Sequence, residues 1–293
     1  MASLQLYRRR IKSINSTRQI TKAMELVAAS KMRRAQEQTS RLSDYASTTE
    51  EFVRILSSIT DPVAHPLLYR PAESGNNKKL MVTITSDRGL AGVYNSALLR
   101  KVIEVETKDS THMTNYLTIG KKGQDFLNRL AKTIVASFTK FPPHPSIADI
   151  QPIVKIISDG FLSRQYSSVH IAYTKYISTI KLEPQVFQLL PIEPPPSLTE
   201  LNIAPRGRAE YKFEPTRDEV LEFILPRALE TVIYRTILES IASEHSARMI
   251  AMKNASDNAK DLIDDLTLTY NSVRQAKITQ ELSEIATAAG AVT

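Results

Sequence analysis

The sequence predicts an α/β domain flanked by N- and C-terminal helices that pair as a long antiparallel coiled coil. All fifteen prolines lie between Pro62 and Pro226, and seven of the eight glycines lie between Gly75 and Gly207. Residues 1–61 and 227–289 therefore contain neither residue type. Because proline costs about 3 kcal/mol and glycine about 1 kcal/mol inside a helix, both stretches favour long uninterrupted helices. Helices of this length are typical of a coiled coil.

The N-terminal helix, predicted over 1–61, carries a seam of mostly apolar residues spaced three and four apart. A second apolar row interrupts this pattern at Ile20, Ala23, Met24, Leu26 and Val27, so the helix is apolar on most sides around residues 20–32. A helix that is apolar all round is buried all round. One partner helix cannot bury it, and we expect a sleeve of other protein there. The seam positions are Leu4, Tyr7, Ile11, Ile14, Arg18, Thr21, Glu25, Ala28, Met32, Ala35, Thr39, Leu42, Ala46, Thr49, Val53 and Leu56.

The C-terminal helix, predicted over 216–293, begins near a capping-box spacing from Thr216 to Glu219. Pro226 is expected to open its main part or to kink it. Its end, "ATAAGAVT", is small and apolar, which suits a buried tip. A seam on the same spacing is expected at Ile241, His245, Arg248, Met252, Ala255, Ala259, Leu262, Leu266, Thr269, Val273 and Ala276.

Residues 78–190 alternate strand and helix patterns, which predicts a Rossmann-like α/β domain with a mainly parallel sheet. The strands are expected at 79–85, 115–119, 133–139, 168–177 and 180–190. The helices are expected up to about residue 105, over 122–131 and over 146–164. Residues 191–215 contain "PIEPPPSLTELNIAPRGR" and are predicted to be a proline-rich connection.

The charge is divided between the two ends of the chain. The net charge is +7, and residues 1–61 hold eleven Lys/Arg against six Asp/Glu, whereas residues 210–293 hold nine against fourteen. Opposite signs suit two helices that lie together. The basic helix could instead bind nucleic acid or resemble a transit peptide, but its bases surround the helix and its pattern continues past residue 24. No apolar run reaches the length of a membrane span, and the chain has no cysteine.

No catalytic or cofactor site is expected. The loop "TSDRGLAGVYN" follows a strand but lacks the Gly-Lys-Ser/Thr of a P-loop, and we predict a tight turn with Asp87 and Arg88 exposed. The five histidines have no metal-ligand spacing, and His245 is expected to be a packed or polar seam residue.

Two long motifs resemble the signatures of the γ subunit of F-type ATP synthases. They are "RRRIKSINSTRQITKAMELVAASKMRRAQ" near the N-terminus and "ESIASEHSARMIAMKNASDNAKDLIDDLTLTYNSVRQAKITQELSEI" near the C-terminus. "SDRGLAG" and "YKFEP" match shorter family segments. The resemblance implies a central rotor shaft that couples proton-driven rotation of the c-ring to conformational changes at the catalytic β subunits. It also implies a non-catalytic subunit whose partners are the α and β subunits, ε and the c-ring.

The resemblance also implies roles for six residues. Met24 matches a position facing the β lever region, although plain seam packing stays open for it. Arg274 and Gln275 match a pair that contacts a loop of β, and Glu281 lies in the same motif. Tyr211 and Glu214 match positions near the contact with the c-ring or ε.

The implied location is the cytoplasmic side of a bacterial cell membrane, with membrane contact only through the c-ring. No cysteine-bearing insertion of the kind found in chloroplast forms is present, which favours a bacterial protein. A static coiled-coil scaffold or adaptor, with no moving role, is the alternative that periodicity alone leaves open.

Overall fold

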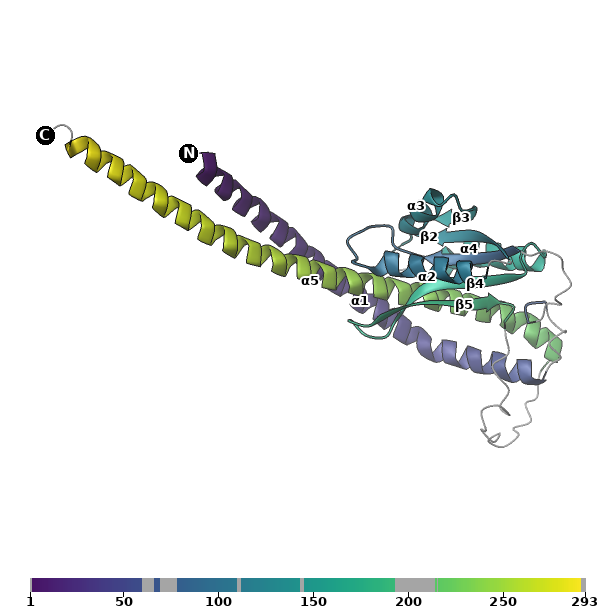
Figure 1. The fold of residues 1–293 in the computed structure, drawn as a ribbon. Helices are drawn as coiled ribbons and strands as arrows, with labels where there is room; N and C mark the ends of the chain where they lie inside the picture. Colours follow the sequence, from purple (N-terminus) through teal and green to yellow (C-terminus); the bar gives the residue numbers. More distant parts are fainter. Residues whose placement is uncertain are drawn as a thin grey trace. The chain divides into compact units, whose positions relative to one another are not determined.

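The computed structural model describes residues 2–59, 66–68, 78–109, 112–142, 145–192, 214 and 216–290. Its contacts divide the chain into two compact units, Met1–Ala29 with Arg248–Thr293, and Ser30–Ala247. Two long helices, α1 (Ala2–Ile59) and α5 (Arg217–Gly290), contribute to both units. They are the purple-to-blue and green-to-yellow ribbons of Figure 1. The predicted long terminal helices are thus confirmed.

In the first unit, α1 and α5 run antiparallel (Figure 1). The Nε atom of Arg8 donates a hydrogen bond of 2.7 Å to the hydroxyl of Tyr270, and its guanidinium carbon lies 5.3 Å from the centroid of that ring. The predicted seam of α1 is confirmed over its described length, because each seam position from Leu4 to Leu42 is buried or half-buried.

The predicted seam of α5 is confirmed at eight of its eleven positions, which are buried or half-buried, and is wrong at Leu262, Thr269 and Ala276, which are exposed. The confirmed positions are Ile241, His245, Arg248, Met252, Ala255, Ala259, Leu266 and Val273. At each exposed position the inner side chain belongs to the next residue, so Ile263, Tyr270 and Lys277 are half-buried. Tyrosine and lysine combine an apolar body with a polar tip, which a count of apolar letters misses. The inner positions are Met252, Ser256, Ala259, Ile263, Leu266, Tyr270, Val273 and Lys277.

The second unit holds a five-stranded sheet in the order β3-β2-β1-β4-β5. The first four strands are parallel and β5 is antiparallel to β4, which confirms a mainly parallel sheet. The strands are β1 (Lys78–Ile84), β2 (Met113–Ile119), β3 (Ile134–Phe138), β4 (Ser168–Tyr176) and β5 (Leu182–Leu190). The connecting helices are α2 (Tyr94–Lys108), α3 (Lys121–Arg129) and α4 (Ile147–Leu162).

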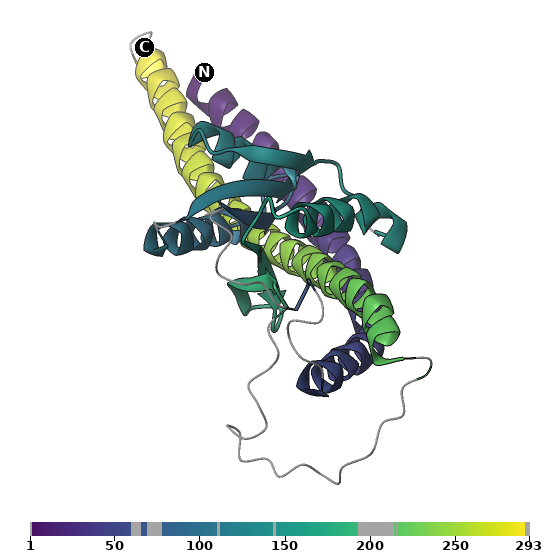
Figure 2. The same cartoon turned by 90° about the vertical axis from the view of Figure 1, so that its right-hand side faces the viewer.

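Both faces of the sheet are covered, which explains why β1 reads as a continuous apolar run. Leu80, Val82 and Ile84 point into a core shared with α4 and with the first part of α5. The alternate residue Met81 packs on the other face with Leu98 of α2 and Leu127 of α3. Both views show the green first part of α5 beside the sheet (Figures 1 and 2).

The start of α5 uses the predicted cap. The Oγ1 atom of Thr216 accepts a hydrogen bond of 3.4 Å from the backbone N–H of Glu219. Pro226 lies inside the helix, which continues to Gly290.

Most of the predicted proline-rich connection, residues 193–213, lies outside the described residues. In the part of the chain that the structure describes, no helix combines the length and the apolar character that crossing a bilayer requires.

Candidate partner-contact surface

An apolar row of α1 lies open on the paired helices of the first unit. Ile20, Leu26 and Val27 are 56–62% exposed. Met24, on the same turns, is half-buried. Within this chain the stretch around residues 20–32 is therefore covered on its seam side and open on the other. Contiguous exposed apolar surface of this kind marks a site of protein–protein contact.

The end of α5 has no partner helix from this chain among the described residues. Because the two helices are antiparallel and Arg8 lies beside Tyr270, Ala2 is level with about residue 276 of α5. Residues 277–290 of α5 therefore extend past the first described residue of α1 (Figure 1). Ile278, Leu282 and Ile285 on this segment are 48–66% exposed. We name residues 277–290 the α5 tip.

Three of the predicted contact residues lie together on or next to the α5 tip. Arg274, Gln275 and Glu281 are all exposed. At 100° per residue, Glu281 returns to within about 20° of Arg274 around the helix axis, so the two share one side. Glu281 is paired within the helix, since the Nζ atom of Lys277 lies 3.3 Å from its Oε1 atom.

Met24 is not part of this group. In the antiparallel pairing it is level with about residue 254 of α5, roughly 30 Å along the axis from Arg274. The predicted contacts with β therefore fall on two separate levels of the paired helices. Glu214 is exposed just before α5 begins, and Tyr211 lies outside the described residues.

The loop after β1 differs from its prediction. Arg88 is exposed as expected, but Asp87 is half-buried. The Oδ1 atom of Asp87 accepts a hydrogen bond of 3.0 Å from the backbone N–H of Lys121, and its Oδ2 atom accepts one of 3.2 Å from that of Phe141. This carboxylate thus ties three loops together at the carboxyl end of the sheet. His245 is buried on α5, as expected of a packed residue.

Comparison with known proteins decides the family. The family model described as ATP synthase matches residues 3–292. The ATP synthase gamma chain of Roseiflexus castenholzii is 41% identical over 296 residues, which cover 100% of this chain and 99% of that protein. The chain belongs to the ATP synthase gamma chain family.

Solved structures of this kind share the fold. A chain of the Tetrahymena thermophila mitochondrial ATP synthase central stalk and c-ring matches with a TM-score of 0.59 and 25% identity, covering 81% of this chain and 99% of that chain. A chain of the Euglena gracilis mitochondrial ATP synthase, from a structure of OSCP, F1 and the c-ring, matches with a TM-score of 0.68 and 18% identity. That second match covers 99% of this chain and 95% of the other, and supports the gamma chain fold.

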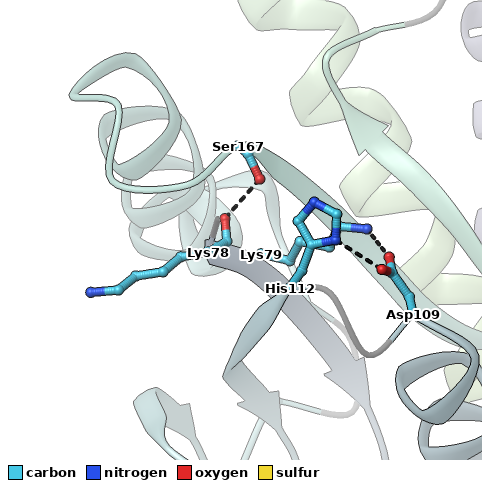
Figure 3. Close-up of polar contacts among 5 residues, drawn as sticks. All are labelled: Lys78, Lys79, Asp109, His112 and Ser167. Carbon is cyan, nitrogen blue, oxygen red and sulfur yellow. Dashed lines mark hydrogen bonds and ion pairs between the residues drawn. The ribbon is translucent and has the colours of Figure 1, made fainter. Parts of the chain in front are cut away.

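A polar cluster that the sequence did not reveal lies at the amino end of β1 and β2 (Figure 3). The ammonium of Lys79 contacts the Oδ2 atom of Asp109, and the Nδ1 atom of His112 lies 2.8 Å from its Oδ1 atom. Next to it, the hydroxyl of Ser167 donates a hydrogen bond of 3.0 Å to the backbone oxygen of Lys78. These contacts join the end of α2 to two strands of the sheet. In this family member they are a structural feature of the α/β fold.

His170 of β4 lies near this cluster. Burial lowers its pKa to about 4, and the positive charge of Lys79 adds to this effect, as does His112. The negative charge of Asp109 acts in the opposite direction. No group of three or more possible metal ligands occurs among the described histidine, aspartate and glutamate side chains.

We expect the chain to lose stability in mild acid because of His170. The pKa of histidine in an unfolded chain is about 6.5, whereas the pKa of His170 in the folded chain is about 4. Between these two pH values the unfolded state binds a proton and the folded state does not, so acid favours unfolding. The stabilisation is present above about pH 6.5 and falls progressively towards pH 4. Partial solvent screening limits the loss to about 1–2 kcal/mol. Urea unfolding at about pH 7 and pH 5 measures it, and His170→Gln should flatten the difference. If the free energy of unfolding depends equally on pH in the wild-type chain and in His170→Gln, then His170 is not the cause of the acid sensitivity.

Proposed function

We propose that this chain is the central rotor shaft of an F-type ATP synthase. It couples proton-driven rotation of the c-ring to conformational changes at the catalytic β subunits. The observation that carries this proposal is the open apolar surface of the paired helices, Ile20, Leu26 and Val27 with the α5 tip. A static scaffold would also use a coiled coil, but gamma chain relatives along the whole length favour the rotor.

The α and β subunits are the partners that surround the paired helices in this proposal. The contacts with β lie at two levels along the paired helices. Met24 makes the contact at one level, and the other level holds Arg274, Gln275 and Glu281. Arg274 is suited to a bidentate contact with a carboxylate of β. Rotation brings different sides of the helices to each β subunit in turn, and the differences in contact energy favour different conformations at the three sites.

The other end of the rotor binds the c-ring and ε through Tyr211 and Glu214. The solved Tetrahymena relative comes from a central stalk with its c-ring, which supports this arrangement. The protein belongs to a membrane-associated enzyme complex. Within it, we place the chain as a non-catalytic, peripheral subunit on the cytoplasmic side of a bacterial cell membrane, with no cofactor of its own.

Purification through a tag on this chain tests the proposal. The chain should bring down α and β at about one copy for three of each, with ATPase activity in the eluate. Recovery of the chain alone, without ATPase activity, would overturn the rotor assignment.

Charged residues on the α5 tip should weaken this capture. Replacing both Ile278 and Leu282 with aspartate places two carboxylates where the proposal buries apolar surface against α and β. We expect the recovered α and β to fall about fivefold or more, since an unpaired buried charge is strongly unfavourable. The matched control is Ile180→Asp, in the turn between β4 and β5, where the side chain is 88% exposed. Equal capture by the double variant and the control would contradict a buried tip.

A further inference from the structure

Three serines of α5 make directional contacts with the α/β domain, all within the second unit. Ser240, Ser243 and Ser246 are all fully buried. They recur every third residue and so form a stripe along one side of the helix. They are the last buried hydroxyls of α5 before this unit ends at Ala247.

Each serine reaches a different element. The hydroxyl of Ser240 lies 2.7 Å from the hydroxyl of Tyr94, the first residue of α2, which also donates to the backbone oxygen of Ser240 at 3.2 Å. Ser243 donates a hydrogen bond of 2.9 Å to the backbone oxygen of Thr174 on β4. Ser246 donates one of 2.7 Å to the backbone oxygen of Thr179, in the turn before β5. We name these four contacts the serine seam.

The preceding part of α5 is held by apolar contacts together with two side-chain hydrogen bonds, from Gln151 to Glu230 and from Tyr234 to the backbone oxygen of Pro145. Burial of apolar side chains in the main core is favourable but non-directional. The residues of α5 that pack there include Leu221, Leu225, Leu229, Ile233 and Ile237. Such contacts oppose separation of the helix from the sheet. Hydrogen bonds depend steeply on angle, and a buried hydroxyl or carbonyl left without a partner is costly. Turning α5 about its own axis would break all the contacts of the seam together.

We infer that the serine seam locks α5 to the α/β domain against rotation and carries torque between them. The inference rests on the proposed function, in which torque enters through the end of the rotor that contacts the c-ring and leaves through the paired helices. Ser240, Ser243, Ser246 and Tyr94 are then positioning residues, because they act on the β subunits only through α5. The proposed β contacts, Met24, Arg274, Gln275 and Glu281, all lie in the other unit.

The test uses the complete synthase in membrane vesicles with the combined variant Tyr94→Phe, Ser243→Ala and Ser246→Ala. These changes keep the packing volume nearly constant and remove three hydroxyls. We expect proton-driven ATP synthesis and ATP-driven proton pumping to fall at least fivefold, while ATP hydrolysis by the same vesicles stays within twofold of wild type. The matched control is Ser158→Ala on α4, whose hydroxyl donates a hydrogen bond of 3.2 Å within its own helix, to the backbone oxygen of Lys155. It should leave all three activities unchanged.

The outcomes separate the inference from the proposed function. Synthesis and pumping within twofold of wild type in the assembled variant would overturn the inference and leave the rotor assignment standing. A wild-type chain that fails to assemble with α and β would overturn both. If the combined variant does not assemble, Tyr94→Phe alone decides, since it keeps the ring. It should lower the ratio of synthesis to hydrolysis at least twofold, and an unchanged ratio would overturn the inference.

Discussion

Replacing Arg274 with alanine is expected to slow coupled ATP turnover of the assembled synthase about tenfold. Arg274 is exposed beside the α5 tip, on the same side of the helix as Glu281. A guanidinium can bind a carboxylate of β with two parallel hydrogen bonds, and tenfold corresponds to about 1.4 kcal/mol, a modest share of such a contact. ATP synthesis by vesicles and torque in single-molecule rotation measure the loss.

Arg100→Ala is the matched control for this experiment. Arg100 is an exposed arginine on α2. It belongs to the second unit, whereas the proposed β contacts belong to the first. The control should leave turnover unchanged, and its assembly yield should equal that of Arg274→Ala. Unchanged turnover and torque in Arg274→Ala would remove this residue from the coupling contact.

Replacing Gly120 with alanine is expected to destabilise the α/β domain by about 3 kcal/mol or more. Gly120 follows β2 with a φ of +98°, in a region that residues with a Cβ atom rarely adopt. A Cβ atom there would also lie 2.1 Å from the backbone oxygen of Thr85. That backbone is fixed in place, because the N–H of Thr85 donates a 2.8 Å hydrogen bond to Ile119. The urea midpoint of the purified chain measures the effect.

Gly89→Ala is the control for the backbone change. At Gly89 a Cβ atom would meet only the Cε atom of Lys122, at 3.9 Å, which is ordinary contact. The expected change is within about 0.5 kcal/mol. If the two variants unfold at the same urea concentration, the close approach of Gly120 to Thr85 does not stabilise the fold.

The long helices and the sheet could be predicted from the sequence because their signals are local. A region free of proline and glycine, or a strand bounded by turn residues, identifies itself without knowledge of its neighbours. The seam of α1 was likewise predictable, because aliphatic residues occupy most of it. The seam of α5 was predictable at eight of its eleven positions. At the others the inner side chains include Tyr270 and Lys277, whose placement depends on what lies opposite, as Arg8 lies opposite Tyr270.

Contacts between distant segments explain the other differences. Asp87 looked like an exposed turn residue, yet its carboxylate bonds to backbone N–H groups 34 and 54 residues away. The cluster of Lys79, Asp109 and His112 forms only when parallel pairing aligns β1 with β2. The roles of Met24, Arg274, Gln275, Glu281, Tyr211 and Glu214 depend on other subunits, and stay predictions until those contacts are measured.

The unaccompanied α5 tip has a consequence for the order of events during assembly. Among the described residues, no second helix shields its backbone hydrogen bonds, and helices of about fourteen residues are marginal in water. Its amide hydrogens should therefore exchange quickly in the free chain, whereas those of Ser240 and Ser243 should exchange only with unfolding of the α/β domain. Enclosure by α and β would then order the last turns of α5, so the helix becomes fully rigid only after these subunits surround it.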